Sequence, residues 1–278
     1  MLVRSLLASV AVAAAAVDAT KILVPLYSYS ESCWPELQQA AATNPSASFI
    51  GIINPDSGPG SSDVEDPSLY CIPVLRQNIP NLSLVGYVRT TYGARDPNEV
   101  AKDVQTYKTW AGLTVSAGGV SGSGKLDGIF FDETPTFTDS TAKFSQYTWY
   151  SQITRTAFGK TGVSTIVFNP GTYANPRLYS YGDFVVSYED AWAKFGAAKA
   201  PSSSLLQKSI VMAHTFPNST ATLQSAVRTL VPKYGGVYIT NVDINYQDVY
   251  QSFGSNWQTF VKDVAAIKSK ARRTLQLE

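Results

Sequence analysis

Eight short apolar runs recur along the chain, and segments with helical spacing separate them. Most are rich in Val, Ile, Phe and Tyr and are apolar on both faces, as strands covered on both sides of a parallel sheet must be. The runs are residues 22–28, 48–54, 82–90, 126–133, 165–170, 184–190, 209–216 and 236–242. The fourth run is distinctive because its Gly-Ile-Phe-Phe core ends in two adjacent carboxylates, Asp132 and Glu133, and Pro135 then ends the strand.

The segments between the runs carry apolar stripes at helical spacing. One begins at Asp96, which can cap a helix whose first position is Pro97. Its apolar face then consists of Val100, Val104, Tyr107 and Trp110. Further helices are predicted over 35–42, 67–77, 144–158, 220–231 and 256–268, whereas the pieces after the fifth and sixth strands are short or irregular.

Eight β–α units in about 260 residues match the usual size of a (β/α)₈ barrel of the TIM type, in the α/β class. A doubly wound open sheet is the alternative, but no Gly-rich nucleotide turn follows the first strand. We expect one catalytic domain over residues 20–278 and a flexible loop over 116–124. That loop resembles a phosphate-binding loop in spacing, yet Leu126 stands where Ser or Thr must be, and a strand follows instead of a helix.

The first 19 residues have the pattern of a signal peptide. Arg4 precedes an apolar run over 6–17, and Val17 and Ala19 are the small residues of a cleavage site. The run is too short to span a bilayer comfortably, so we expect a secreted or cell-wall protein, with an uncleaved anchor as the alternative. Only 15% of residues are charged and the net charge is +1, which argues against disorder and against a nucleic-acid partner.

Secretion changes how the two cysteines are interpreted. Cys33 and Cys71 are the only ones, and an oxidising compartment favours a disulfide between them over two free thiols. Asn81 and Asn218 begin Asn-x-Ser/Thr sequons and are predicted glycosylation sites.

In a barrel the active site forms where the strands end. The strand ends here are polar, acidic and aromatic. The predicted substrate-binding residues are Tyr27, Asn54, Tyr87, Arg89, Asn169, Tyr188, His214 and Asn241. With one His and no third Cys, a zinc site is not expected, and no Gly-x-Ser-x-Gly motif is present. We therefore expect neither a metal nor a cofactor.

Paired carboxylates are the remaining candidates for catalysis at the strand ends, and glycoside hydrolysis requires two carboxyl groups. Asp132 or Glu133 on the fourth strand can face Glu189 on the sixth across the end of the fifth strand. Two strand spacings are about 9–10 Å, which leaves a retaining or an inverting geometry open. Successive strand residues point to opposite faces, so Asp132 and Glu133 do not both face the substrate unless the strand bends. The alternatives are a structural network with Arg89 and an exposed loop acid at position 189, and His214 is more simply a structural or subsite residue.

Five segments together resemble the spherulin-4 family, which includes fungal Sph3-type glycoside hydrolases. They are Ile-Leu-Val-Pro-Leu-Tyr at 22–27, Ile-Asn-Pro-Asp-Ser-Gly-Pro-Gly at 53–60, Gly-Tyr-Val-Arg-Thr at 86–90, Gly-Ile-Phe-Phe-Asp-Glu at 128–133 and Val-Phe-Asn-Pro-Gly at 167–171. The resemblance implies a (β/α)₈ fold and endo-hydrolysis of α-1,4-linked galactosamine polymers. It implies Asp132 as nucleophile, Glu189 as acid/base and Glu133 as a residue that orients or tunes them.

We therefore expect a secreted endo-acting glycoside hydrolase that acts on a polysaccharide as a monomer, with no nucleic-acid partner and no stable membrane insertion after signal cleavage. The alternative is a non-catalytic carbohydrate-binding or cell-wall protein on the same barrel, because one fold supports many functions.

Overall fold

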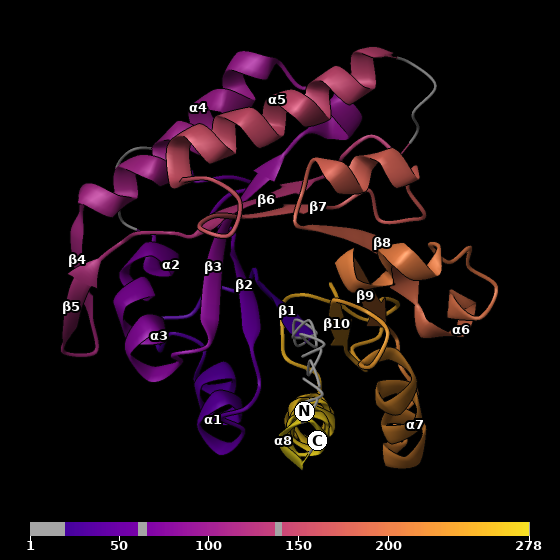
Figure 1. The fold of residues 1–278 in the computed structure, drawn as a ribbon. Coiled ribbons are helices and arrows are strands. Elements are labelled where there is room, and N and C mark those ends of the chain that lie inside the picture. Colours follow the sequence, from indigo (N-terminus) through magenta and orange to yellow (C-terminus); the bar gives the residue numbers. More distant parts are fainter. Residues whose placement is uncertain (1–19, 61–65, 137–140, 278) are drawn as a thin grey trace, which may run out of the picture.

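The computed structural model describes residues 20–60, 66–136 and 141–277. The predicted signal peptide at residues 1–19 lies outside them. Eight parallel strands close into a barrel in the order β1-β10-β9-β8-β7-β6-β3-β2, and Figure 1 shows the helices around it. The barrel strands are β1 (Lys21–Leu26), β2 (Phe49–Ile53), β3 (Leu82–Arg89), β6 (Gly128–Asp132), β7 (Thr165–Phe168), β8 (Phe184–Ala191), β9 (Ser209–His214) and β10 (Gly236–Ile239). The predicted barrel is confirmed.

Helices follow the strands on the outside of the barrel (Figure 1). They are α1 (Pro35–Thr43), α2 (Pro67–Tyr70), α3 (Ile72–Asn78), α4 (Pro97–Thr109), α5 (Thr141–Phe158), α6 (Trp192–Phe195), α7 (Thr220–Leu230) and α8 (Trp257–Leu277). As predicted, the Asp96 side chain caps α4 by accepting from the backbone N–H of Asn98 at 2.7 Å. No helix of the described residues is long and apolar enough to cross a bilayer.

The segment predicted as helical over 67–77 is helical, but it is split into α2 and α3 at Cys71, because Pro73 has no N–H to donate to the preceding turn. Another local prediction was wrong. The stretch 116–124, expected to be a flexible loop, lies largely in an antiparallel hairpin of β4 (Thr114–Ala117) and β5 (Val120–Ser123). Gly118 and Gly119 join its strands with φ of 56° and 80°, which suits the two left-handed positions of a tight hairpin turn.

The barrel core follows directly from the apolar runs. Ile129, Phe130 and Phe131 of β6 are fully buried, as expected for a strand covered on both faces. Gly128 begins β6 at a point of close approach, because a Cβ there would lie 1.8 Å from the carbonyl oxygen of Thr165. The strand that carries the acidic pair is therefore anchored against β7.

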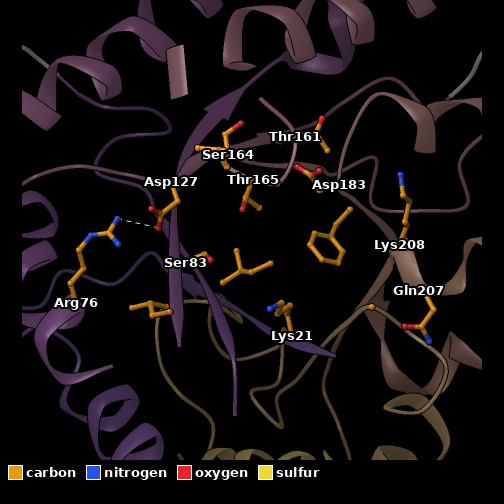
Figure 2. Close-up of a pocket in the computed structure, with 16 residues that line it drawn as sticks. Lys21, Arg76, Ser83, Asp127, Thr161, Ser164, Thr165, Asp183, Gln207 and Lys208 are labelled. Carbon is orange, nitrogen blue, oxygen red and sulfur yellow. Dashed lines mark hydrogen bonds and ion pairs between the residues drawn. The ribbon is translucent and has the colours of Figure 1, made fainter. Parts of the chain in front are cut away.

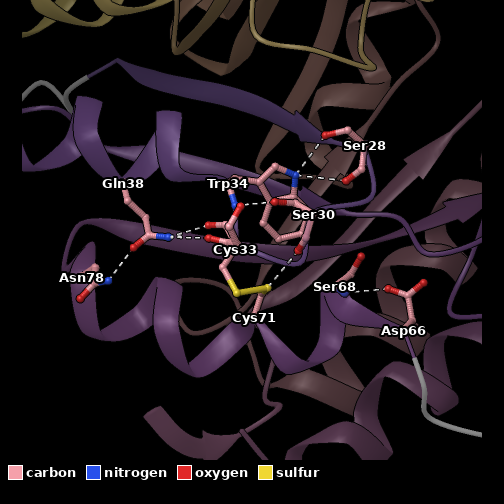
Figure 3. The surroundings of a disulfide bond; sticks show 10 residues. Ser28, Ser30, Cys33, Trp34, Gln38, Asp66, Ser68, Cys71 and Asn78 are labelled. Atoms are coloured by element: carbon pink, nitrogen blue, oxygen red, sulfur yellow. Dashed lines mark hydrogen bonds between the residues drawn. A yellow bond between two sulfur atoms is a disulfide. The ribbon is translucent and has the colours of Figure 1, made fainter. Parts of the chain in front are cut away.

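The disulfide predicted between Cys33 and Cys71 is present (Figure 3). It joins the segment between β1 and α1 to the junction of α2 and α3. Next to it, the Trp34 indole donates to the carbonyl oxygen of Ser28 at 3.2 Å, and the Trp34 N–H donates to the Ser30 hydroxyl at 2.9 Å. The bond thus fastens the loop that follows β1, at the end of the barrel where the acidic pair lies.

Candidate active site

Asp132 is the last residue of β6, and the barrel fixes its backbone from both sides. It pairs in register with Arg89 at the end of β3, and the Asn169 N–H donates to the Phe131 carbonyl oxygen at 2.8 Å. The buried Thr90 hydroxyl donates to the carbonyl oxygen of Asp132 at 2.9 Å. These bonds place the Asp132 carboxylate at the carboxyl end of the barrel, between β3 and β7.

Asn169 joins Asp132 to Glu189. The residue follows β7, and its Nδ2 donates to Asp132 Oδ1 at 2.7 Å and to Glu189 Oε2 at 2.6 Å. Its Oδ1 accepts from the Gly171 N–H at 2.8 Å, which fixes the orientation of the amide. The two carboxylate oxygens are therefore at most 5.3 Å apart, the sum of the two bonds to one nitrogen. Asp132 and Glu189 face each other across the end of the fifth barrel strand.

Two phenols hold the other oxygens of these carboxylates. Tyr87 Oη donates to Asp132 Oδ2 at 2.5 Å, and Tyr250 Oη donates to Glu189 Oε1 at 2.5 Å. The ring of Tyr27 packs edge-on against both phenol rings, with centroids 5.6 Å from Tyr87 and 5.7 Å from Tyr250. Contacts thus form a closed ring, in the order Asp132, Asn169, Glu189, Tyr250, Tyr27, Tyr87. We call these six residues the carboxylate ring.

Glu133 has a different partner from Asp132. Its φ is 50°, in the left-handed region, so the chain bends where β6 ends. Its carboxylate pairs with Arg89, with Nε and Oε2 2.8 Å apart. Hence the two neighbouring acids have different partners, and Glu133 makes a polar pair at the edge of the carboxylate ring.

The electrostatics of the two facing carboxylates differ. Burial raises the pKa of Asp132, although bonds from Tyr87 and Asn169 lower it in part. Burial also raises the pKa of Glu189, and the negative charge of Asp132 raises it further. The charge of Asp132 thus favours the protonated form of Glu189. Burial and the adjacent carboxylates raise the pKa of Tyr87 and of Tyr250, which keeps both phenols protonated as donors.

Two predicted substrate-binding residues hold loops. Asn54 Oδ1 accepts from the Gly58 N–H at 3.2 Å, and Asn241 Nδ2 donates to the Ser255 hydroxyl at 2.7 Å. Both side chains remain partly exposed. In the described part of the chain, no hydrogen bond joins either one to Asp132 or Glu189.

Tyr188 and His214 are also engaged within the protein. Tyr188 is buried and its Oη donates to the Ala191 carbonyl oxygen at 2.5 Å. His214 is buried with its Nδ1 2.9 Å from the Thr215 hydroxyl, and burial lowers its pKa. His214 therefore tends to be neutral.

Tyr250 was missed by sequence reasoning. It lies in the long loop between β10 and α8, 61 residues after Glu189, and not at a strand end. The loop over 240–256 is rich in Asn, Asp, Gln and Ser and contains two tyrosines, and this composition was the available signal. Asn169 was predicted as a substrate-binding residue, whereas its amide bridges the two carboxylates.

A cavity of about 640 Å³ opens at the end of the barrel where the strands begin, opposite the end that carries Asp132 and Glu189 (Figure 2). Its acids serve the fold. Asp127 pairs with Arg76 at 3.1 Å and accepts from the Leu84 N–H, while Asp183 pairs with Arg155 at 2.8 Å and accepts from a strand N–H. These carboxylates fasten strand starts, so this cavity is not the candidate active site.

The remaining predicted sites concern metals and modification. No group of three or more His, Cys, Asp or Glu side chains placed to hold a metal occurs within the described ranges. Asn81 and Asn218 are both exposed, and Asn81 Nδ2 donates to the Pro45 carbonyl oxygen at 2.9 Å. Both sequons remain predictions.

Comparisons with known proteins agree on one family. The model of spherulation-specific family 4, Spherulin4, matches residues 21–264. Spherulin-4 of Physarum polycephalum is 29% identical over 253 residues, which are 87% of this chain and 69% of the relative. The crystal structure of Aspergillus clavatus Sph3 in complex with GalNAc is similar with a TM-score of 0.75 and 27% identity, over 89% of this chain and 98% of that one.

Proposed function

Since the chain belongs to the spherulation-specific family 4, we propose that it is a secreted glycoside hydrolase that cuts within α-1,4-linked galactosamine polysaccharides. The family resemblance expected from the sequence motifs is confirmed. The Sph3-like fold is consistent with a glycosidase-like or carbohydrate-binding role.

The observation that carries the proposal is the bridge made by Asn169. It holds two carboxylates with facing oxygens at most 5.3 Å apart, the sum of its two bonds. Retaining glycosidases place their two carboxyl groups about 5–5.5 Å apart, whereas inverting enzymes need about 6.5–9.5 Å to admit a water molecule. The spacing favours a retaining enzyme.

The two carboxylates then divide the reaction. Asp132, in its ionised form, attacks the anomeric carbon, and the bond to the leaving oxygen breaks as Glu189 donates its proton to that oxygen. Glu189, now ionised, takes a proton from water, and the water oxygen displaces Asp132 from the sugar. The charge of Asp132 raises the pKa of Glu189, which suits the residue that must start protonated.

The proposed sugar follows from the relative and from the local charge. Sph3 of Aspergillus clavatus was crystallised with GalNAc. Asp132, Glu133 and Glu189 give the strand ends an acidic character that would attract a free amino sugar. The disulfide between Cys33 and Cys71 supports secretion, because such bonds persist in oxidising compartments.

A non-catalytic carbohydrate-binding protein is the second candidate. Each of the four oxygens of Asp132 and Glu189 already accepts a hydrogen bond from the protein, as it would in a purely structural network. Hydrolysis separates the two candidates.

The test is mass spectrometry of products after incubation with galactosamine polymers of known acetylation. We expect short oligomers from the wild type, none from Asp132→Asn, and about 10²–10⁴-fold slower release from Glu189→Gln. Asp190→Asn is the matched control, because Asp190 neighbours Glu189 but pairs with Lys194 at 2.8 Å. Unimpaired turnover by either carboxylate variant would remove that residue from the mechanism, and binding without products would favour the second candidate.

A further inference from the structure

The loop after β3 contains a left-handed turn. Thr91, Tyr92 and Gly93 are consecutive and have φ of 49°, 53° and 82°. Residues other than glycine visit this region singly, because their Cβ crowds the following carbonyl oxygen. Such conformations persist only where the surroundings impose them, and they cluster at binding sites.

Bonds from three sides impose the conformation. The Gly93 N–H donates to the Thr90 carbonyl oxygen at 2.9 Å, and the Gln146 amide of α5 donates to the Gly93 carbonyl oxygen at 2.7 Å. The Tyr92 N–H donates to the carbonyl oxygen of Glu133 at 2.6 Å. Glu133 is itself left-handed, so two strained segments meet directly beside the carboxylate ring.

The turn holds the Tyr92 side chain where it does not contribute to the packing of the fold. The Tyr92 side chain is 60% exposed. Within the part of the chain that the structure describes, its ring packs on no other aromatic ring and its hydroxyl makes no hydrogen bond. By contrast, the tyrosines at the strand ends, Tyr87 and Tyr188, are buried and donate hydrogen bonds inside the protein. The phenols of Tyr87 and Tyr188 are therefore occupied by bonds within the protein, whereas the ring of Tyr92 is accessible to a ligand.

We propose that Tyr92 is an outer sugar-binding platform, on which a pyranose ring of the glycan stacks next to the unit held at Asp132 and Glu189. This inference rests on the proposed function and adds a subsite to it. A pyranose presents an apolar face of C–H groups to an exposed aromatic ring. The carbonyl oxygen of Glu133 accepts from the Tyr92 N–H, and the Glu133 carboxylate pairs with Arg89. This ion pair offers charged groups to the hydroxyl or amino substituents at the edge of that sugar.

Binding is tested apart from hydrolysis, in full-length protein made inactive by Asp132→Asn. Affinity electrophoresis in gels that contain a partly N-acetylated α-1,4-galactosamine polymer gives the dissociation constant. Tyr92→Ala should weaken binding about tenfold, the loss expected for one stacked ring, whereas Tyr92→Trp should retain it. Val163→Ala is the control and should change nothing, because Val163 is 63% exposed and lines the cavity at the opposite end of the barrel.

Stability gives a second readout that needs no ligand. Glycine accepts a left-handed φ without crowding, so Tyr92→Gly should leave the melting temperature unchanged or raise it by a few degrees. A clear fall would show that the fold itself requires Tyr92 and would overturn the proposal.

The binding outcomes separate this proposal from the proposed hydrolysis. Equal affinity with and without the Tyr92→Ala substitution, with polymer still cut by the active enzyme, would overturn the platform alone. Tyr92-dependent binding without cleavage by the active protein would support the platform and overturn the hydrolase. A polymer that is neither bound nor cut would overturn both.

Discussion

Asn169 shows how much one side chain can organise. Its amide donates to Asp132 and Glu189 through one nitrogen, and its oxygen is tied to the Gly171 N–H. An amide can do this because its nitrogen carries two hydrogens and stays uncharged, so it holds both carboxylates without neutralising either. A lysine at this position would lower the pKa of both acids, and the proton needed on Glu189 would be lost.

At the residue scale, the two phenols of the carboxylate ring predict a pH effect. Tyr87 lowers the pKa of Asp132 and Tyr250 lowers that of Glu189 through their donated bonds. Asp132 must be ionised, so Tyr87→Phe raises its pKa and moves the acidic limb of kcat/KM to higher pH. Glu189 must be protonated, so Tyr250→Phe raises its pKa and moves the basic limb to higher pH. The profile of kcat/KM against pH measures both shifts.

Tyr246→Phe is the control for this experiment, because Tyr246 lies in the same loop as Tyr250 and is 88% exposed. Its profile should match that of the wild type. Movement of the opposite limb in each variant would exchange the roles of Asp132 and Glu189. An unchanged profile in both variants would show that the phenols do not tune the acids.

At the scale of elements, an irregularity in β8 aims Glu189. Val186 pairs with Ile210 of β9, but Tyr188 pairs with Val211, so Ser187 is an extra residue in the ladder. Such a bulge bends the strand and redirects the side chains that follow it. The strict alternation of a regular strand therefore does not hold at Glu189.

The disulfide predicts a loss of stability at the same scale. It closes a loop with a sequence separation of 38 residues, which contributes about 4 kcal/mol to the free energy of unfolding in the chain-entropy model. The double variant Cys33→Ser, Cys71→Ser should melt on the order of 10 °C lower, as measured by calorimetry. Wild-type protein under reducing conditions should match it, and an unchanged melting temperature would show that the packing of Trp34 alone secures this loop.

At the scale of the whole molecule, charge is arranged unevenly although the net charge is only +1. Asp132, Glu133 and Glu189 lie together at the carboxyl end of the barrel, with Arg89 as the cation paired to Glu133. A cluster of negative charges attracts cationic ligands, and salt shortens the range of that attraction. The screening length falls from about 10 Å at 0.1 M salt to about 3 Å at 1 M salt.

This asymmetry predicts a salt effect that depends on the polymer. The KM for a free-amine galactosamine polymer should rise several-fold between 0.05 and 0.5 M salt, on the order expected when surface attraction is screened. The KM for the fully N-acetylated polymer should stay nearly constant, because that chain is neutral. Initial rates on both polymers across the salt series measure the difference, and parallel curves would mean that charge does not select the substrate.

The sequence by itself determined the barrel, the end of the barrel at which the acids lie and the cysteine pair. Apolar runs such as residues 128–131 show strand burial directly, because a strand covered on both faces needs apolar residues at every position. Only the tertiary structure decided which groups meet at the acids. Tyr250 reaches Glu189 across 61 residues, and Glu133 turns toward Arg89 through a left-handed bend. Such contacts depend on loop paths and backbone angles, which hydrophobic periodicity does not encode.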